Sequence, residues 1–338
     1  MGCIQQKEKN IMQHNQQQNK RLDELLSSSL STHIVQRIFL SGFQLEDQHM
    51  LSLCSALAQC VNLEILDLYL YGVQLGQISG VSNLGAALGK CTKLSKLKLI
   101  LDQNKIKDEE IQGLGQGLEK CSLLCNFYIS LGNNLIESKG ISSFFSSLEY
   151  CCNFSDFEII LENNLINSEG ASGLSKPLGN WRNLTNLSIS LEDNKIEKQG
   201  VTNLGIYLGN CNKLQNLKLN LRNNIILSEG AQNLVSNLKN CSKLSSLYLD
   251  FSQQYCLENH RNQKANFVYK EKDFLDKNFF KTVLIQDLSY SNYLLQVSSF
   301  EDNNSIQDDQ KDTLIRKWDT ETISILFSSE NRYFCVSR

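Results

Sequence analysis

The chain has 338 residues, of which 41% are hydrophobic and 20% charged, so it can bury a core and is not wholly disordered. Its formal net charge of -3 provides no global basic field for a polyanion, and we expect no nucleic-acid partner. No apolar run reaches the roughly 18 residues that a membrane-spanning helix needs, and the N-terminus lacks the apolar core of a secretion signal.

Residues 1–33 are rich in Gln and Asn, which predicts a disordered segment that carries an acylation signal. Removal of Met1 would expose Gly2 for myristoylation, and Cys3 would take palmitate. Two acyl chains bind a bilayer stably where one binds marginally, so Gly2 and Cys3 form a coherent pair. Gln6 departs from the stricter signal, which has Ser or Thr there. This start resembles the membrane-anchored ends of Src-family kinases, and the resemblance implies attachment at the cytoplasmic face of a membrane.

Over residues 34–251 the sequence repeats itself at steps of 30. Cysteines recur at this step, with Trp181 in one of their places: Cys91, Cys121, Cys151, Cys211 and Cys241. Each unit then carries the same apolar positions and one asparagine, as in Leu94, Leu97, Leu99, Leu101, Asn104 and Ile106. Such a fixed period is the signature of a repeat architecture.

The apolar period changes inside each unit. Leu97, Leu99 and Leu101 alternate with other residues, which predicts a strand with one buried face. Leu204 and Leu208, four residues apart, are typical of the helical half. We expect four residues to be helix N-caps: Asp108, Ser138, Ser168 and Ser228. Pro177 should distort or end its helix.

A strand–helix unit of this size cannot bury its own apolar face, but stacked neighbours can. We therefore predict a solenoid with a parallel inner sheet and outer helices. The asparagines should line up and satisfy backbone groups at the bend after each strand. The cysteines should stack as small apolar fillers, and we expect free thiols because the chain is neither small nor secreted.

The pattern LxxLxLxLxxNxI resembles leucine-rich repeats, and the helical half is similar to the ribonuclease-inhibitor and Ran-GAP class. The resemblance covers about residues 34–251 and implies an α/β fold, a right-handed horseshoe with a period of 30 residues. One departure is an extra strand dipeptide, as in Leu97-Lys98-Leu99-Ile100-Leu101. An even insertion lengthens the strand without turning its faces over.

The polar residues between the strand leucines should lie on the concave face, the sheet face turned away from the helices. Tyrosines among unlike charges are typical of protein interfaces, and an acidic cluster at 156–192 would favour a partner with a basic patch. The alternative is an ordinary solvated face. The candidate binding residues are Asp67, Tyr69, Tyr71, Lys96, Lys98, Tyr128, Asp156, Glu158, Glu162, Glu192, Lys218, Arg222, Tyr248 and Asp250.

After Phe251 the 30-residue rhythm stops, so residues 252–338 form a separate C-terminal region. Residues 312–319 resemble the closing strand of a WD40 blade, and 288–290, 293–295 and 327–333 resemble other blade strands. This is less than the roughly four blades of a propeller. We predict a region that is partly disordered or holds degenerate WD40-like strands.

No P-loop, HExxH, GxSxG or kinase signature is present, and no histidine is spaced with cysteine as a metal ligand. Gly113, Gly115 and Gly117 fall on the helical side, where small residues allow close packing. We predict a cytoplasmic, non-enzymatic protein-binding scaffold without cofactor or metal. The Ran-GAP resemblance implies an alternative, activation of a small GTPase, which stimulated GTP hydrolysis would reveal. A regulatory piece of a larger enzyme is a third interpretation.

Overall fold

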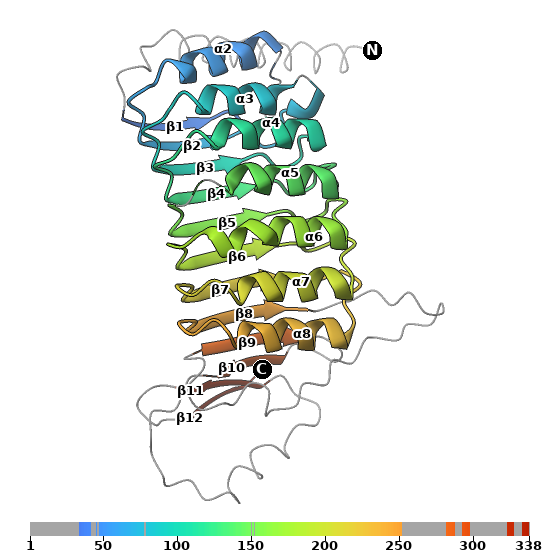
Figure 1. Cartoon of the computed structure of the whole chain (residues 1–338). Coiled ribbons are helices and arrows are strands. Elements are labelled where there is room, and N and C mark those ends of the chain that lie inside the picture. The colour runs from blue at the N-terminus through green and yellow to red at the C-terminus, as the bar shows by residue number, and fades with distance from the viewer. Residues whose placement is uncertain are drawn as a thin grey trace, which may run out of the picture.

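Strands and helices alternate along one axis in the computed structural model of the chain (Figure 1). The structure describes residues 34–41, 45, 47–77, 79–149, 151 and 153–251, and the backbones of four strands at 282–287, 293–297, 323–327 and 333–337. The sheet forms one layer and the helices form the other. The predicted acylation residues Gly2 and Cys3 lie outside the described part of the chain.

Every unit contributes one short strand, and most contribute one longer helix. The strands are β1 (Val35–Phe39), β2 (Ile65–Tyr69), β3 (Lys96–Ile100), β4 (Asn126–Ser130), β5 (Asp156–Ile160), β6 (Asn186–Ser190), β7 (Asn216–Asn220) and β8 (Ser246–Asp250). The helices are α2 (Asp47–Ala58), α3 (Gly80–Leu88), α4 (Asp108–Leu118), α5 (Ser138–Leu148), α6 (Ser168–Ser175), α7 (Lys198–Leu208) and α8 (Ser228–Leu238). Two 3-10 turns, η2 (Leu75–Gln77) and η3 (Lys176–Asn180), complete the repeats.

Strands β1 to β8 pair in parallel and in sequence order. The paired positions form a single file through Leu97, Phe127, Phe157, Leu187 and Leu217, each of which is 2% exposed. One face of each strand is thus buried against the helices, as the alternation predicts. The repeat period and the solenoid architecture are confirmed.

The asparagines after the strands form a buried column that serves the backbone. The Nδ2 of Asn164 donates to the carbonyl oxygens of Leu131, Leu161 and Glu162 at 3.0 to 3.2 Å, and its Oδ1 accepts from the amide of Ile136. Asn104, Asn134, Asn194 and Asn224 are buried and hydrogen-bond to backbone groups in the same manner. The predicted role is confirmed, because these amides satisfy polar groups that water cannot reach.

The cysteine column does more than fill space. Each thiol donates to the carbonyl oxygen 33 or 34 residues earlier, as Cys121 does to Leu88 at 3.4 Å and Cys241 to Leu208 at 3.0 Å. Trp181 replaces a thiol and keeps this bond, because its Nε1 donates to the Leu148 carbonyl at 3.1 Å. The column therefore ties the end of each helix to the neighbouring repeat through one donor per unit.

The predicted N-caps are wrong by one residue. The helices begin at Asp108, Ser138, Ser168 and Ser228, and the caps are the preceding residues. Three of these side chains accept from the next repeat instead. Asp108 accepts from the amide of Glu137, Ser138 from that of Asn167 and Ser168 from that of Glu197. The polar side chain at this position joins two repeats rather than capping its own helix.

Two other local expectations hold. α6 ends at Ser175, and the following 3-10 turn contains Pro177, which cannot continue an α-helix. A side chain at Gly117 would collide with the carbonyl oxygen of Gly85, and one at Gly113 would collide with Ser82. These glycines allow α3 and α4 to pack closely, as expected from their helical position.

Beyond β8 the sheet continues through β9 (Thr282–Asp287), β10 (Tyr293–Val297), β11 (Ile323–Phe327) and β12 (Tyr333–Ser337). β9 pairs in parallel with β8, whereas β9 with β10 and β11 with β12 are antiparallel. The WD40-like interpretation stays a prediction, since its segment at 312–319 lies outside the described residues.

Candidate functional site

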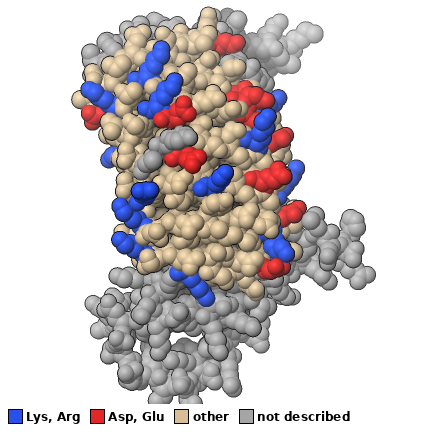
Figure 2. Space-filling model, in the orientation of Figure 1, with Lys and Arg blue, Asp and Glu red and all other residues tan. Residues whose placement is uncertain are grey.

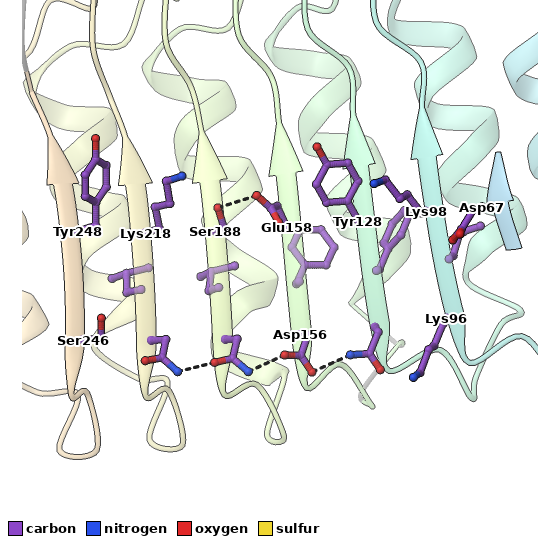
Figure 3. A pocket seen from close by; sticks show the side chains of 18 residues that line it. Asp67, Lys96, Lys98, Tyr128, Asp156, Glu158, Ser188, Lys218, Ser246 and Tyr248 are labelled. Carbon is purple, nitrogen blue, oxygen red and sulfur yellow. Dashed lines mark hydrogen bonds between the residues drawn. The ribbon is translucent and has the colours of Figure 1, made fainter. Parts of the chain in front are cut away.

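The concave face holds a groove of about 750 Å³ that crosses the strands from β2 to β8. Its floor is the backbone of the middle strand positions, such as Phe127 and Phe157, whose side chains are buried on the helix side of the sheet. Polar side chains at the flanking strand positions rise from this floor (Figure 3). Eight of the predicted binding residues line the groove: Asp67, Lys96, Lys98, Tyr128, Asp156, Glu158, Lys218 and Tyr248. The sheet thus brings together residues that lie far apart in the sequence.

The remaining predicted residues lie outside the groove lining. Tyr69 stacks on Phe39 with ring centroids 4.4 Å apart, and Tyr71 is 42% exposed. Asp250 is buried at 6% exposure. Glu162, Glu192 and Arg222 follow the ends of β5, β6 and β7.

A ladder of side-chain amides lies along one edge of the groove (Figure 3). The Nδ2 atoms of Asn126 and Asn186 donate to the two carboxylate oxygens of Asp156, at 2.8 and 2.5 Å. Asn216 donates to the Oδ1 of Asn186 at 2.5 Å. Asn186 and Asn216 also line the groove, although they were not among the predicted binding residues. The signal was the first strand position, which is polar in four successive units from Asn126 to Asn216.

The second row of groove residues combines aromatic rings with charges. The ammonium of Lys98 lies 5.4 Å from the ring of Tyr69 and 4.8 Å from that of Tyr128, so two neighbouring repeats bracket it. Lys218 lies 5.5 Å from the ring of Tyr248. Burial raises the pKa of Tyr128, and the carboxylates of Glu158 and Asp102 raise it further. The phenol is therefore a neutral hydrogen-bonding group at physiological pH.

Carboxylates on the strands or just after their ends accept hydrogen bonds from the next repeat. Asp102 accepts from the Ser130 hydroxyl at 2.6 Å and from the Gly132 amide at 2.9 Å. Glu162 accepts from Ser190 at 2.8 Å, and Glu158 accepts from Ser188 at 3.2 Å. These bonds hold the carboxylates in place without cancelling their charge, because the donors are neutral.

Ion pairs are sparse among the described residues of this face. Arg37 pairs with Asp67 at 3.0 Å, and Arg222 pairs with Glu192 at 3.5 Å. Asp156, Glu158 and Glu162 have no ion pair within the described chain. On the helix-bearing face, acidic and basic side chains are interspersed instead (Figure 2).

The described residues offer little for metal or thiolate chemistry. No group of three or more His, Cys, Asp or Glu side chains in this part of the chain is placed to hold a metal ion. Burial raises the pKa of Cys121 to about 12, with neighbouring thiols adding to the effect, and burial alone raises that of Cys241 to about 12. These thiols are protonated donors, not nucleophiles. None of the described helices is both long and apolar enough to cross a membrane.

The class of the protein follows from its own repeats. Eight parallel strands, alternating with helices and locked by an asparagine column, define a leucine-rich-repeat solenoid of the α/β class. No protein-family model and no curated protein matches the chain. Among solved structures it is similar to an internalin C2 from Listeria monocytogenes str. 4b F2365, at 15% identity and a TM-score of 0.40. That match covers 71% of this chain and 84% of the internalin chain.

Proposed function

We propose that the chain is a non-enzymatic scaffold that binds a protein partner on its concave face. The observation that carries the proposal is the groove, where Asp156 and Glu158, two carboxylates with no ion pair among the described residues, lie in a lining that also holds tyrosine rings. Half-buried tyrosines anchor interfaces because they bury large area at small entropic cost. Unpaired carboxylates attract a complementary basic patch.

The fixed geometry of the groove supports the same proposal. Hydrogen bonds between neighbouring repeats already orient the side chains of Asp156 and Glu158. A partner would therefore find them ordered before it binds, so little ordering cost falls on association.

The test replaces three carboxylates by alanine, Asp156→Ala, Glu158→Ala and Glu162→Ala, in the full chain. Partner capture from cell extract should weaken, and its dependence on salt should become shallower, because charge attraction is screened. The matched control removes three exposed carboxylates on the helix side of the sheet: Glu109 in α4, Glu119 at the C-cap of α4, and Glu169 in α6. Equal capture by the wild type and both triple variants would refute a concave binding site.

A membrane tether at Gly2 and Cys3 is a separate part of the proposal. It is supported by the sequence signal, and it would hold the scaffold at the cytoplasmic face of a membrane. Gly2→Ala should move the protein from the membrane fraction to the soluble fraction, because myristoylation requires glycine there. Unchanged fractionation of Gly2→Ala, with no acyl mass on the wild-type N-terminus, would contradict the tether.

A further inference from the structure

From β3 to β7 the charges in the groove are sorted into stripes, whereas Asp67 on β2 lies beside Lys98 and pairs with Arg37. Lys96 and Lys98 on β3 form a basic stripe, and Asp156 and Glu158 on β5 form an acidic one. Lys218 on β7 is basic again. The strands between the stripes, β4 and β6, contribute only uncharged residues to the groove.

This spacing keeps the stripes from neutralising one another. Neighbouring strands lie about 4.8 Å apart, so charges on adjacent strands would be within reach of an ion pair. Charges two strands apart are separated by about 10 Å. Accordingly, no stripe residue forms an ion pair within the described chain. The charge of each stripe is therefore not cancelled by an ion pair within the described residues.

The spacing also matches a regular element of a partner. In an α-helix, residues seven positions apart lie on one face and are separated by about 10.5 Å along the axis. Residues three or four apart are also neighbours on that face, so a helix can offer two like charges to one stripe. A polyproline helix has about the same repeat of 9.3 Å but presents one residue per turn. The paired charges on β3 and β5 therefore favour the α-helix.

We infer that the groove binds an α-helix of a partner protein that lies across the strands. The side of this helix that faces the groove carries acidic, basic and acidic residues in turn, at steps of seven residues. The inference rests on the proposed function and names the chemistry of its partner. The acidic positions of the helix face Lys96 and Lys98 at one end and Lys218 at the other. Its central basic pair faces Asp156 and Glu158.

The experiment uses two synthetic helical peptides of three heptads and the full chain. The acid–base–acid peptide carries a pair of glutamates in its first heptad, a pair of lysines in its second and a pair of glutamates in its third. The inverse peptide carries lysine, glutamate and lysine pairs in the same positions. Attraction to a chain of net charge -3 would favour the inverse peptide, which is the more basic. We expect the opposite, a preference of about tenfold for the acid–base–acid peptide at low salt, because several opposed charge pairs each contribute a small part of the affinity.

Reversing the stripes should reverse the preference. The reversed variant carries Lys96→Glu, Lys98→Glu, Asp156→Lys, Glu158→Lys and Lys218→Glu, and its fold is checked by circular dichroism. The control exchanges the ion pair between α7 and α8, as Lys198→Glu with Glu229→Lys, and should leave the preference unchanged. Tighter binding of the inverse peptide, equal binding of both, or a preference that survives stripe reversal would overturn the inference. Those results would leave the scaffold role intact, because partner capture by the carboxylate variants tests that role independently.

Discussion

The columns of side chains inside the solenoid differ in kind from the rows on its concave face. Inside, one residue type recurs at every step, as with the asparagines from Asn104 to Asn224. On the concave face the same strand position holds Lys98, Tyr128, Glu158, Ser188 and Lys218 in turn. The repeated columns satisfy the backbone of every unit, and this need is the same everywhere. The side chains of the rows face solvent or a partner. Nothing in the fold therefore requires the same residue type at each step of a row.

This comparison predicts that changes inside the columns cost stability and changes in the rows do not. The largest effect should come from Trp181, which is 2% exposed and packs on Phe154 and Phe157 with ring centroids 4.7 and 4.8 Å away. Trp181→Ala should lower the free energy of unfolding by about 3–5 kcal/mol in urea denaturation, because it leaves a cavity. A loss under about 1 kcal/mol would contradict the packing role.

Trp181→Phe separates the two functions of this side chain. It keeps much of the aromatic contact but removes the Nε1 donor to the Leu148 carbonyl. We expect a loss of about 1–2 kcal/mol, the cost of one unsatisfied buried carbonyl.

The next effect should come from the asparagine column. Asn164→Ala removes the partner of three carbonyl oxygens and one amide, all in a buried region. We expect the free energy of unfolding to fall by on the order of 3 kcal/mol. Asn186→Ala is the matched control, because its amide bonds side chains on the concave face. If the two variants lose equal stability, the distinction between columns and rows fails.

The thiol column predicts an alkaline limit to stability. Burial raises the pKa of Cys121, Cys211 and Cys241 from 9.0 to about 12. A raised folded-state pKa stabilises the fold below the unfolded pKa of 9.0, and this contribution is lost as the pH rises from there to about 12. At about pH 10, the loss of this contribution should lower the free energy of unfolding by about 1 kcal/mol for each thiol.

The measurement is urea denaturation of the wild type and of the triple variant Cys121→Ser, Cys211→Ser, Cys241→Ser between about pH 8 and pH 10. Serine keeps a donor for the same carbonyls but does not ionise in this range. The decline with pH should therefore be shallower in the variant. Parallel curves would show that other groups set the alkaline limit.

The sequence predicts the columns well and the contacts between repeats poorly. The period of 30 residues is sufficient to place Leu97, Phe127 and Phe157 in one file, because the units from β3 onward have the same length. It could not show that Asp108 accepts from Glu137 in the next unit, since that bond depends on the offset between stacked helices. From the sequence alone, such residues are expected to cap their own helix.

The candidate site shows the same limit. Alternation along the strands placed Lys98, Tyr128 and Glu158 on one face, because side chains of a strand point to alternate sides. The amide ladder through Asn186 was not predicted, because the direction of an amide is set by its neighbour across the sheet. The isolation of the stripes likewise depends on the side-chain geometry of adjacent repeats.

The smallest predicted effect on stability is that of removing the charge of Glu158 from the concave face. Glu158→Gln removes a charge from the acidic stripe, yet Gln can still accept the hydrogen bond from Ser188. Because the side chain is only half-buried and has no ion pair within the described chain, its charge should contribute less than about 0.5 kcal/mol to stability. Urea denaturation should give an unchanged midpoint and slope, while affinity for the acid–base–acid peptide falls. A stability loss as large as that of Asn164→Ala would mean that the concave charges hold the fold together, and the rows would then be structural like the columns.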